Sequence, residues 1–392
     1  MNDYSPKKYH ITTFGCQANV ADSSTMAGTL ESLGFEWVSD FREADLYIVN
    51  TCSVRQKSED KVYGIGKEIK ELNENSKKLP FILMAGCMVG SVTGERQRYA
   101  FEELKRRTPW VNEYINPHQL QKLPEILKVN NLIDSWAVNK LDFDNSNPKN
   151  LNDEPDHAFV NISLGCDNFC SFCVVPYSRG AEKSRSKEEI ILEIKHYILR
   201  GVKKITLCAQ NVNSWGLDMS EKFEIRSGSD QKLPFASLLR EVHEIEGLEK
   251  IDFLSSNPFD FTSDLIDALT LPKISDYLHI AVQSGNNEIL KKMNRRHSVE
   301  DFISLIERIK EKKPNLVLGT DIIVGFPTES NEQFEDTIKL FQKIKFKVAF
   351  ISIYSPRKGT PAEKFYKDDV PLKEKKERHA RLTKVWQESL LK

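Results

Sequence analysis

The chain has 392 residues, 40% of them hydrophobic and 29% charged, which suits two or three domains with their own cores. Its 56 lysine and arginine residues nearly balance 57 aspartate and glutamate residues, and the net charge of −1 excludes a uniformly basic coat for nucleic acid but not a local basic patch. We see no signal peptide and no run approaching the ~18 apolar residues of a membrane span. We therefore expect a cytoplasmic protein whose 7 cysteines bind metal, react or lie buried rather than form disulfides.

Residues 1–127 alternate strand-like and helix-like segments, and this order predicts an open parallel sheet with helices on both faces. Asp22 is a candidate N-cap of the first helix, and Gly34 is its candidate stop signal. The expected strands are 9–14, 44–50 and 81–85, and the expected helices are 22–33, 58–73 and 94–106.

Residues 128–156, rich in Asn, Asp and Pro, are predicted to be a linker. Six further strands alternate with helices over 157–365 and predict an α/β fold with a partial (β/α)6 barrel rather than a complete eightfold one. The polar stretch 218–232 is an expected surface insertion, and 366–392 is an expected helical extension. The barrel strands are expected at 157–164, 203–208, 250–254, 277–282, 316–324 and 348–354.

The strongest motif is the compact triple Cys166, Cys170 and Cys173, directly after the first barrel strand. Three thiolates at this spacing can bind three of the four irons of a [4Fe-4S] cluster and leave the fourth open to a substrate atom. A structural zinc ion is the alternative, but it needs a fourth, distant ligand. The carboxyl ends of barrel strands form active sites, so the position favours the cluster.

A second, scattered set consists of Cys16, Cys52 and Cys87, each two residues past a predicted strand. Singly, each is more often a buried apolar residue than a ligand. The carboxyl ends of parallel strands meet at one edge, so the three cysteines are expected to converge on a metal. Cys208 lies inside an apolar strand and is expected to pack in the core.

Several segments resemble the radical SAM methylthiotransferases, and the matches run in family order from about residue 9 to residue 362. Within that family the chain is most similar to the MiaB branch, which modifies tRNA, through Thr51–Arg55 and Gln210–Ser214. The matching segments are Gly15–Asn19 with Asp22–Ser23, Asn50–Arg55, Ala85–Met88, Leu164–Gly180, Gln210–Ser214, Val282–Gly285, Thr320–Pro327 and Tyr354–Pro361.

The resemblance implies addition of a methylthio group to C2 of N6-isopentenyladenosine at position 37 of tRNA. It implies S-adenosylmethionine (SAM) and two [4Fe-4S] clusters. The cluster on Cys166, Cys170 and Cys173 would cleave SAM to a 5′-deoxyadenosyl radical that takes the C2 hydrogen. The cluster on Cys16, Cys52 and Cys87 would deliver the sulfur, methylated by another SAM. Such a C–H bond is beyond side-chain acids and bases, so a cofactor is needed.

Four further residues are candidates for the SAM site. Phe172, between two cysteines of the compact triple, resembles the aromatic residue that borders the SAM adenine in this superfamily. Gln210, Gln283 and Asp321 lie at or just past barrel strands and are expected to face the site. The alternative for these polar residues is a local role in capping strands or holding loops.

Basic residues near the cluster loop are candidate phosphate contacts for a looped-out base. The expected partners are the anticodon stem-loop of tRNA and a reductant such as flavodoxin or ferredoxin, with the chain as a monomer. The alternative to a phosphate contact is a charged surface that only water contacts, and this interpretation is favoured for Lys183. The candidates are Arg179, Arg185, Arg295 and Arg296, with Lys183 and His297 beside them.

Some positions depart from the family pattern, namely Ala281 for proline, Val89-Gly90 for Ala-Gln, and Asn257 for histidine. Relatives usually carry a C-terminal TRAM domain, and this chain ends on the helix that would lead into it, so it either lacks the domain or is truncated. The runner-up substrates are threonylcarbamoyladenosine in tRNA and an aspartate of a ribosomal protein. Alternatives of other classes are a non-enzymatic RNA-binding iron–sulfur redox sensor and a zinc-binding structural protein.

Overall fold

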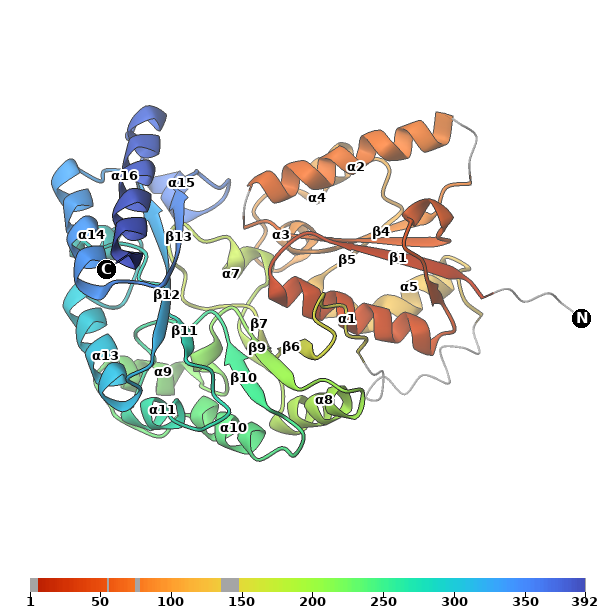
Figure 1. Ribbon diagram of the computed structural model, residues 1–392. Coiled ribbons are helices and arrows are strands. Elements are labelled where there is room, and N and C mark those ends of the chain that lie inside the picture. Colours follow the sequence, from red (N-terminus) through yellow and green to blue (C-terminus); the bar gives the residue numbers. More distant parts are fainter. Residues whose placement is uncertain (1–5, 55, 75–77, 135–147, 392) are drawn as a thin grey trace, which may run out of the picture. The chain divides into compact units, whose positions relative to one another are not determined.

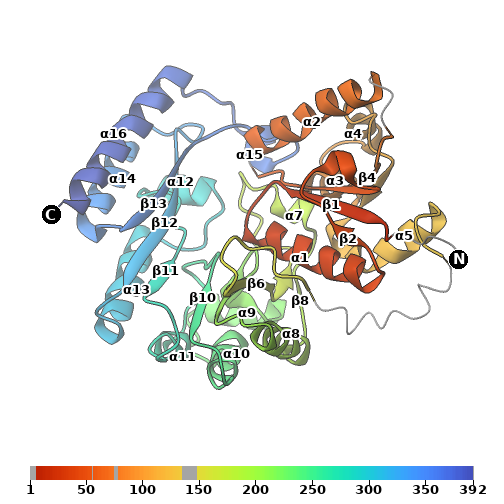
Figure 2. The ribbon, with the colours of Figure 1, turned by 45° about the vertical axis from the view of Figure 1, so that its right-hand side comes forward.

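The computed structural model describes residues 6–54, 56–74, 78–134 and 148–391, so most of the predicted linker centre lies outside the described residues. The chain divides into two compact units, whose elements are drawn in Figures 1 and 2. The first unit runs to Asp167 and includes 174–183 and 192–202, and the second comprises 168–173, 184–191 and 203–392.

A five-stranded parallel sheet forms the centre of the first unit, in the order β2-β1-β3-β4-β5. The three predicted strands are confirmed within a few residues. The two outer strands were not predicted, because two or three residues are too few to show an alternating pattern. The strands are β1 (Lys8–Thr13), β2 (Glu36–Trp37), β3 (Leu46–Thr51), β4 (Phe81–Gly86) and β5 (Glu113–Ile115).

Helices cover both faces of this sheet, as the burial of every residue of β3 requires (Figure 1). Leu46 and Ile48 of β3 pack in the core with α1 (Gln17–Ser32) and α5 (Leu123–Val129). The intervening residues of β3 face the opposite core. That core is formed with α2 (Gln56–Glu74), α3 (Cys87–Thr93) and α4 (Phe101–Arg107).

Two helix predictions in this unit need correction. Helix α1 begins at Gln17, and Cys16 rather than Asp22 is its N-cap residue. Asp22 lies inside the helix and is buried, so its carboxylate serves a tertiary contact. The helix predicted over 94–106 is shorter and is α4, which starts only at Phe101, whereas the unpredicted helix α3 ends before this range with Gly94 as its C-cap residue.

A strand at the start of the predicted barrel, over residues 157–161, falls in the first unit by its contacts. Strand β6 (His157–Asn161) packs on α1. The Asn161 side chain donates hydrogen bonds to Ala18 O at 3.2 Å and to Asp22 Oδ1 at 2.9 Å. These hydrogen bonds join β6 to helix α1.

The second unit contains parallel strands, with helices outside them in both ribbon views (Figures 1 and 2). Strand β9 pairs with β10, strand β12 pairs with β11 and β13, and an isolated bridge joins Ser256 to Ile280. These pairings confirm the α/β class with parallel strands. The strands are β9 (Lys204–Cys208), β10 (Lys250–Phe253), β11 (Tyr277–His279), β12 (Val317–Val324) and β13 (Val348–Ile353).

The predicted polar insertion contains a helix, α9 (Met219–Arg226), which starts with a capping box between Asp218 and Glu221. The predicted C-terminal helix is α16 (Leu372–Leu390). No helix among the described residues is long and apolar enough to cross a membrane. The remaining elements are β7 (Ser163–Leu164), β8 (Lys183–Ser184), α7 (Val175–Ser178), α8 (Lys187–Leu199), α10 (Pro234–His243), α11 (Ser263–Ala268), α12 (Asn287–Lys292), α13 (Val299–Lys312), α14 (Asn331–Ile344) and α15 (Pro361–Phe365).

Candidate functional site

The scattered cysteines lie at the carboxyl edge of the first unit's sheet. Cys16 precedes α1, three residues past β1, whereas Cys52 directly follows β3 and Cys87 directly follows β4. The predicted common offset of two residues is therefore not met. The shared edge is met, and the three thiolates are close enough for their charges to act on one another.

A hydrogen-bonded asparagine pair fixes the loops that carry these cysteines. The Asn19 side chain donates to Asn50 Oδ1 and Thr51 O, both at 3.1 Å, and the Asn50 side chain donates to Asn19 O at 2.8 Å. Gly86 has φ 90°, and a Cβ there would lie 2.3 Å from Thr51 O. Asn19, Asn50 and Gly86 therefore fix the backbone beside the three cysteines.

The protein environment favours the protonated thiol at Cys16 and Cys52. Desolvation raises the pKa of Cys16, although the residue is partly open to solvent, and the Cys87 thiolate adds to the rise. Burial and the Cys87 thiolate raise the pKa of Cys52 to about 12. Binding a metal here must therefore displace protons from sulfur.

A buried arginine provides the positive charge at this edge. Arg179 is 2% exposed, and its Nε donates to Cys87 Sγ at 3.3 Å. Its Nη2 lies 2.7 Å from Asp22 Oδ2, a close ion pair with poor hydrogen-bond angles. Burial works to lower the pKa of Arg179, but the charges of Asp22, Cys87 and Cys16 outweigh it and hold the pKa well above its ordinary value. Burial raises the pKa of Asp22, and the guanidinium opposes that rise.

The residues fit a cluster better than a single ion. Across residues 6–54, 56–74, 78–134 and 148–391, no three His, Cys, Asp or Glu side chains are placed to bind one metal ion. In a cubane cluster each thiolate binds a different iron, so the three sulfurs need not share one coordination sphere. Thiolate donors and a neighbouring guanidinium suit such an anionic iron–sulfur group.

The compact triple lies on the loop after β7, with Cys166 in the first unit and Cys170 and Cys173 in the second. The Cys166 N–H donates to Gly180 O at 3.2 Å, and the Cys173 N–H donates to Cys170 O at 2.9 Å. On the second unit, Arg295 Nη1 lies 3.4 Å from Cys170 Sγ. Both cysteine sets therefore have an arginine N–H on one sulfur.

The candidate SAM residues have different surroundings. Phe172 packs against an apolar cluster that includes Phe326 and Tyr354. Gln283 has φ 75°, a conformation uncommon outside glycine, and its backbone bonds to both Asp321 and Ile323 of β12.

Asp321 lies within β12 rather than past it, and its Oδ2 is 2.7 Å from His279 Nε2. Gln210 lies two residues past β9 and is half-buried. Cys208 is buried at the end of β9, in line with core packing.

The candidate phosphate contacts divide into buried and exposed residues. Arg296 and Lys183 are exposed, and Arg185 lies partly exposed with its Nε 3.8 Å from Glu189. Arg179 is buried against Asp22, which argues against its contacting a phosphate and gives it a different role. Arg295 contacts Cys170, and His297 is buried.

A network behind the cluster loop was not anticipated from the sequence. Arg226 of α9 pairs with Asp260 at 2.7 Å, and its Nη2 donates to Asn168 Oδ1 of the cluster loop at 3.0 Å. Asn257 donates to Asp260 Oδ2 at 2.8 Å, and its carboxamide oxygen accepts from the Asp260 N–H. The only available signal was the motif around Asn213, whose side chain donates to the carbonyls of Asn257 and Asp260.

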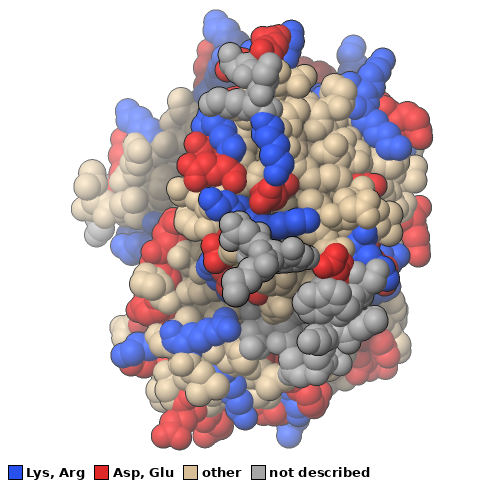
Figure 3. Space-filling view, turned by 90° about the vertical axis from the view of Figure 1, so that its right-hand side faces the viewer, with Lys and Arg blue, Asp and Glu red and all other residues tan. Residues whose placement is uncertain are grey.

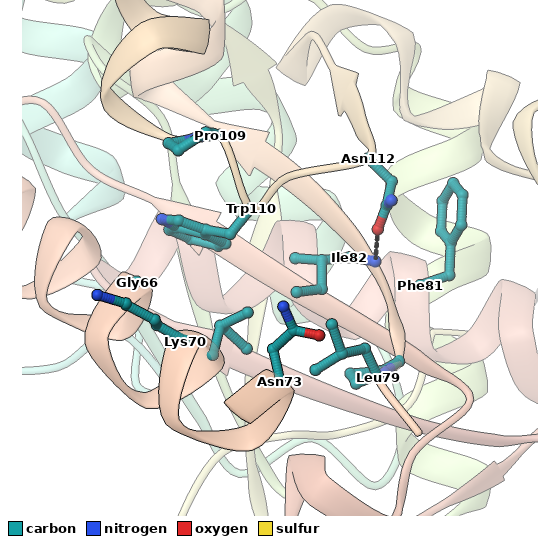
Figure 4. Close-up of a pocket in the computed structure, with 11 residues that line it drawn as sticks. Gly66, Lys70, Asn73, Leu79, Phe81, Ile82, Pro109, Trp110 and Asn112 are labelled. Atoms are coloured by element: carbon teal, nitrogen blue, oxygen red, sulfur yellow. Dashed lines mark hydrogen bonds between the residues drawn. The ribbon is translucent and has the colours of Figure 1, made fainter. Parts of the chain in front are cut away.

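A hollow in the first unit is a separate feature at the opposite end of its strands (Figure 4). It has a volume of about 660 Å³ and lies between α2 and the first residues of β4. Trp110 closes one side, and a Cβ at Gly66 would lie 2.7 Å from its Nε1. The hollow contains no cysteine, so it is distinct from the cysteine edge.

The surface charge agrees with the near-zero net charge. The face shown in Figure 3 carries lysine and arginine side chains interspersed with acidic and neutral ones. The described residues visible on this face therefore form no broad basic surface.

The chain matches two family models and many curated proteins. The Radical SAM superfamily model matches residues 160–341, and the model "Uncharacterized protein family UPF0004" matches residues 8–111. A tRNA-2-methylthio-N(6)-dimethylallyladenosine synthase of Caldicellulosiruptor saccharolyticus is 40% identical, covering 98% of this chain and 79% of that protein. Proteins of the same name from Clostridium botulinum (strain Hall) and Alkaliphilus oremlandii are 40% and 39% identical, covering 97% and 96% of this chain and 82% and 77% of those proteins.

Solved structures share the fold at low sequence identity. The radical S-adenosylmethionine methyltransferase TsrM from Kitasatospora setae aligns with a TM-score of 0.63 and 13% identity, over 91% of this chain and 75% of that one. The cobalamin-dependent S-adenosylmethionine radical enzyme OxsB aligns with a TM-score of 0.59 and 13% identity, over 98% of this chain and 56% of that one. The curated relatives decide the family: the chain belongs to the tRNA-2-methylthio-N6-dimethylallyladenosine synthases of the radical SAM superfamily.

Proposed function

We propose that the chain is a radical SAM methylthiotransferase that adds a methylthio group to C2 of N6-isopentenyladenosine at position 37 of tRNA. The observation that carries the proposal is the meeting of Cys16, Cys52 and Cys87 at one sheet edge, in a chain about 40% identical to enzymes named for this reaction.

The cofactors are SAM and two [4Fe-4S] clusters, one on Cys166, Cys170 and Cys173 and one on the scattered set. When bound, the first supplies the electron that cleaves SAM and the second supplies the sulfur. The chain's residues then have definite tasks. Asn19 and Asn50 keep the cysteine loops in place, and Arg179 balances thiolate charge. Phe172 supplies apolar surface for the SAM adenine, and Gln210, Gln283 and Asp321 supply polar contacts.

The proposed partners of the chain are a tRNA substrate and a protein reductant. The substrate is the anticodon stem-loop of tRNA, with the partly exposed Arg185 and the exposed Arg296 as phosphate contacts. A low-potential protein such as flavodoxin or ferredoxin supplies electrons. The chain acts as a monomer in the cytoplasm, where its tRNA substrate is found.

The decisive test is nucleoside analysis of tRNA from a strain that lacks this gene, before and after complementation. We expect the methylthio derivative of isopentenyladenosine to disappear and to return with the gene. A loss confined to the threonylcarbamoyladenosine derivative would assign the enzyme to the other tRNA branch. Unchanged tRNA would refute the assignment.

A second test separates the two cysteine sets. Anaerobically reconstituted protein should hold about eight irons, and Cys16→Ala, Cys52→Ala and Cys87→Ala together should reduce this to about four. That triple variant should still cleave SAM but transfer no sulfur. Normal sulfur transfer by the triple variant would contradict the proposed role of the scattered set.

A further inference from the structure

Each cysteine set is contacted by one arginine through a ligand sulfur. Arg179 Nε lies 3.3 Å from Cys87 Sγ within the first unit, and Arg295 Nη1 lies 3.4 Å from Cys170 Sγ within the second. We propose that these two arginines set the reduction potentials of the two clusters and bias the electron toward the cluster on Cys170. This inference rests on the proposed function, because it needs both clusters.

The physical basis is the charge that a cluster gains on reduction. An N–H donated to a ligand sulfur and a nearby positive charge both stabilise the reduced, more negative form, so they raise the reduction potential. A guanidinium is always charged, so its effect does not vary with pH. In a buried site the effect is weakly screened.

The two arginines differ in the negative charge that accompanies them. Arg179 is paired with the buried carboxylate of Asp22, which cancels much of its field at Cys87. In the described part of the chain no carboxylate pairs with Arg295. It is held instead by a hydrogen bond to Ala281 O at 2.7 Å and by the ring of Phe259, whose centre lies 5.3 Å from Cζ. The charge of Arg295 therefore acts on Cys170 with less compensation.

Close packing within the first unit sets the position of Arg179. The helix that begins at Cys87 packs on α7, which ends next to Arg179. A Cβ at Gly90 would lie only 1.9 Å from Ser178 O, so any side chain there would push α7 away. The absence of a side chain at Gly90 therefore permits the contact between Arg179 and Cys87.

The test is a redox titration of each cluster by electron paramagnetic resonance, with dithionite as the reductant. Each cluster is measured alone, in the full chain whose other cysteine triple is replaced by alanine. For the cluster on Cys170 the variants are Arg295→Lys and Arg295→Met, and the control is the exposed arginine change Arg308→Met. For the cluster on Cys87 the variants are Asp22→Asn, Arg179→Met, Gly90→Ala, and the double change Asp22→Asn with Arg179→Met.

We expect Arg295→Met to move the midpoint potential of its cluster to more negative values, Arg295→Lys to move it less, and Arg308→Met to leave it unchanged. Asp22→Asn should move the potential of the other cluster to more positive values, because it frees the charge of Arg179. Arg179→Met should move it to more negative values, and the double change should fall between these two. Gly90→Ala should move it in the same direction as Arg179→Met.

Unchanged potentials in Arg295→Met and Asp22→Asn, with full iron content, would overturn the inference. Asp22→Asn is nearly isosteric, so it keeps the inference testable if Arg179→Met fails to fold. Failure of the proposed function looks different, because the unmodified chain would then bind fewer than about eight irons before any arginine is changed.

Discussion

His279 Nε2 lies 2.7 Å from Asp321 Oδ2, and Nδ1 of the same ring lies 2.9 Å from the hydroxyl of Tyr277. Burial and the negative charge of Asp321 raise the pKa of Tyr277 to about 12, so its hydroxyl stays protonated and donates to the ring. The ring in turn donates to the carboxylate. Asp321 Oδ1 has no hydrogen-bond partner among the described residues, and the side chain is 41% exposed, so this oxygen is available to a ligand.

The first prediction concerns Asp321→Asn and binding of SAM. Loss of the carboxylate should weaken SAM binding about tenfold or more, because a hydrogen bond to a charged group contributes about 1.5–3 kcal/mol. His279→Gln should weaken it less, because His279 only orients the carboxylate. Equilibrium dialysis of SAM against anaerobically reconstituted protein measures both. Equal affinity in Asp321→Asn and the unmodified protein would remove Asp321 from the SAM site.

The second prediction concerns Gly86→Ala. A Cβ at this position would lie 2.3 Å from Thr51 O, and φ is 90°, so the loops before Cys52 and Cys87 must shift. We expect iron content to fall from about eight to about four while SAM cleavage persists. The matched control is Gly34→Ala, where φ is also positive but no atom lies within 4 Å of the added carbon. The control should lower stability by about 1 kcal/mol and keep its iron.

Much of the fold could be predicted from local pattern. In the strands before Cys16, Cys52 and Cys87, the residues either alternate between apolar and polar or are uniformly apolar over five or six positions. This length is sufficient for a strand to be recognised from its hydrophobic pattern. Their parallel order then places the cysteines at one edge. The ends of the helices were less predictable. Asp22 is of a residue type that favours the N-cap position, and only its tertiary contact with Arg179 shows that it lies inside the helix.

The surroundings of the cysteines could not be predicted in the same way. Arg179 and Arg295 are far from Cys87 and Cys170 in sequence, at separations of 92 and 125 residues. A basic residue near a cluster loop suggests a phosphate contact equally well, and only burial separates the two roles. The Arg226 and Asp260 pair likewise spans 34 residues, with no local pattern that joins the two.

The third prediction concerns pH and His297. Burial and the charge of Arg295 together lower the pKa of His297 to about 3, whereas the unfolded chain has the ordinary value near 6.5. Between these values the unfolded state binds the proton, so stability is full above pH 6.5 and falls by about 1.4 kcal/mol per pH unit below it. His297→Phe should remove this part of the pH dependence. Urea unfolding at pH 7.5 and 5.5, compared between the two proteins, measures the difference. The same loss on acidification in both would show that His297 is not responsible.

The fourth prediction concerns Arg226→Met and the loop that carries Cys170. Arg226 and Asp260 form a buried ion pair, 8% and 0% exposed, and Arg226 also holds Asn168 at 3.0 Å. Removing one partner leaves a buried carboxylate unpaired, so we expect a loss of about 3–5 kcal/mol in the free energy of unfolding. The loop should also lose its support, so SAM cleavage should fall while the scattered cysteine set keeps about four irons.

The matched control for this variant is Arg240→Met. Arg240 also meets a carboxylate at 2.7 Å, that of Asp264, but its side chain is 40% exposed. Water screens this pair, so the change should reduce the free energy of unfolding by only about 0.2–1 kcal/mol and leave SAM cleavage intact. Asp260→Asn, which keeps the hydrogen-bonding shape and removes the charge, should lie between the two variants in stability. If Arg226→Met cleaves SAM at the unmodified rate despite its lower stability, then the pair stabilises the fold and does not position the cluster loop.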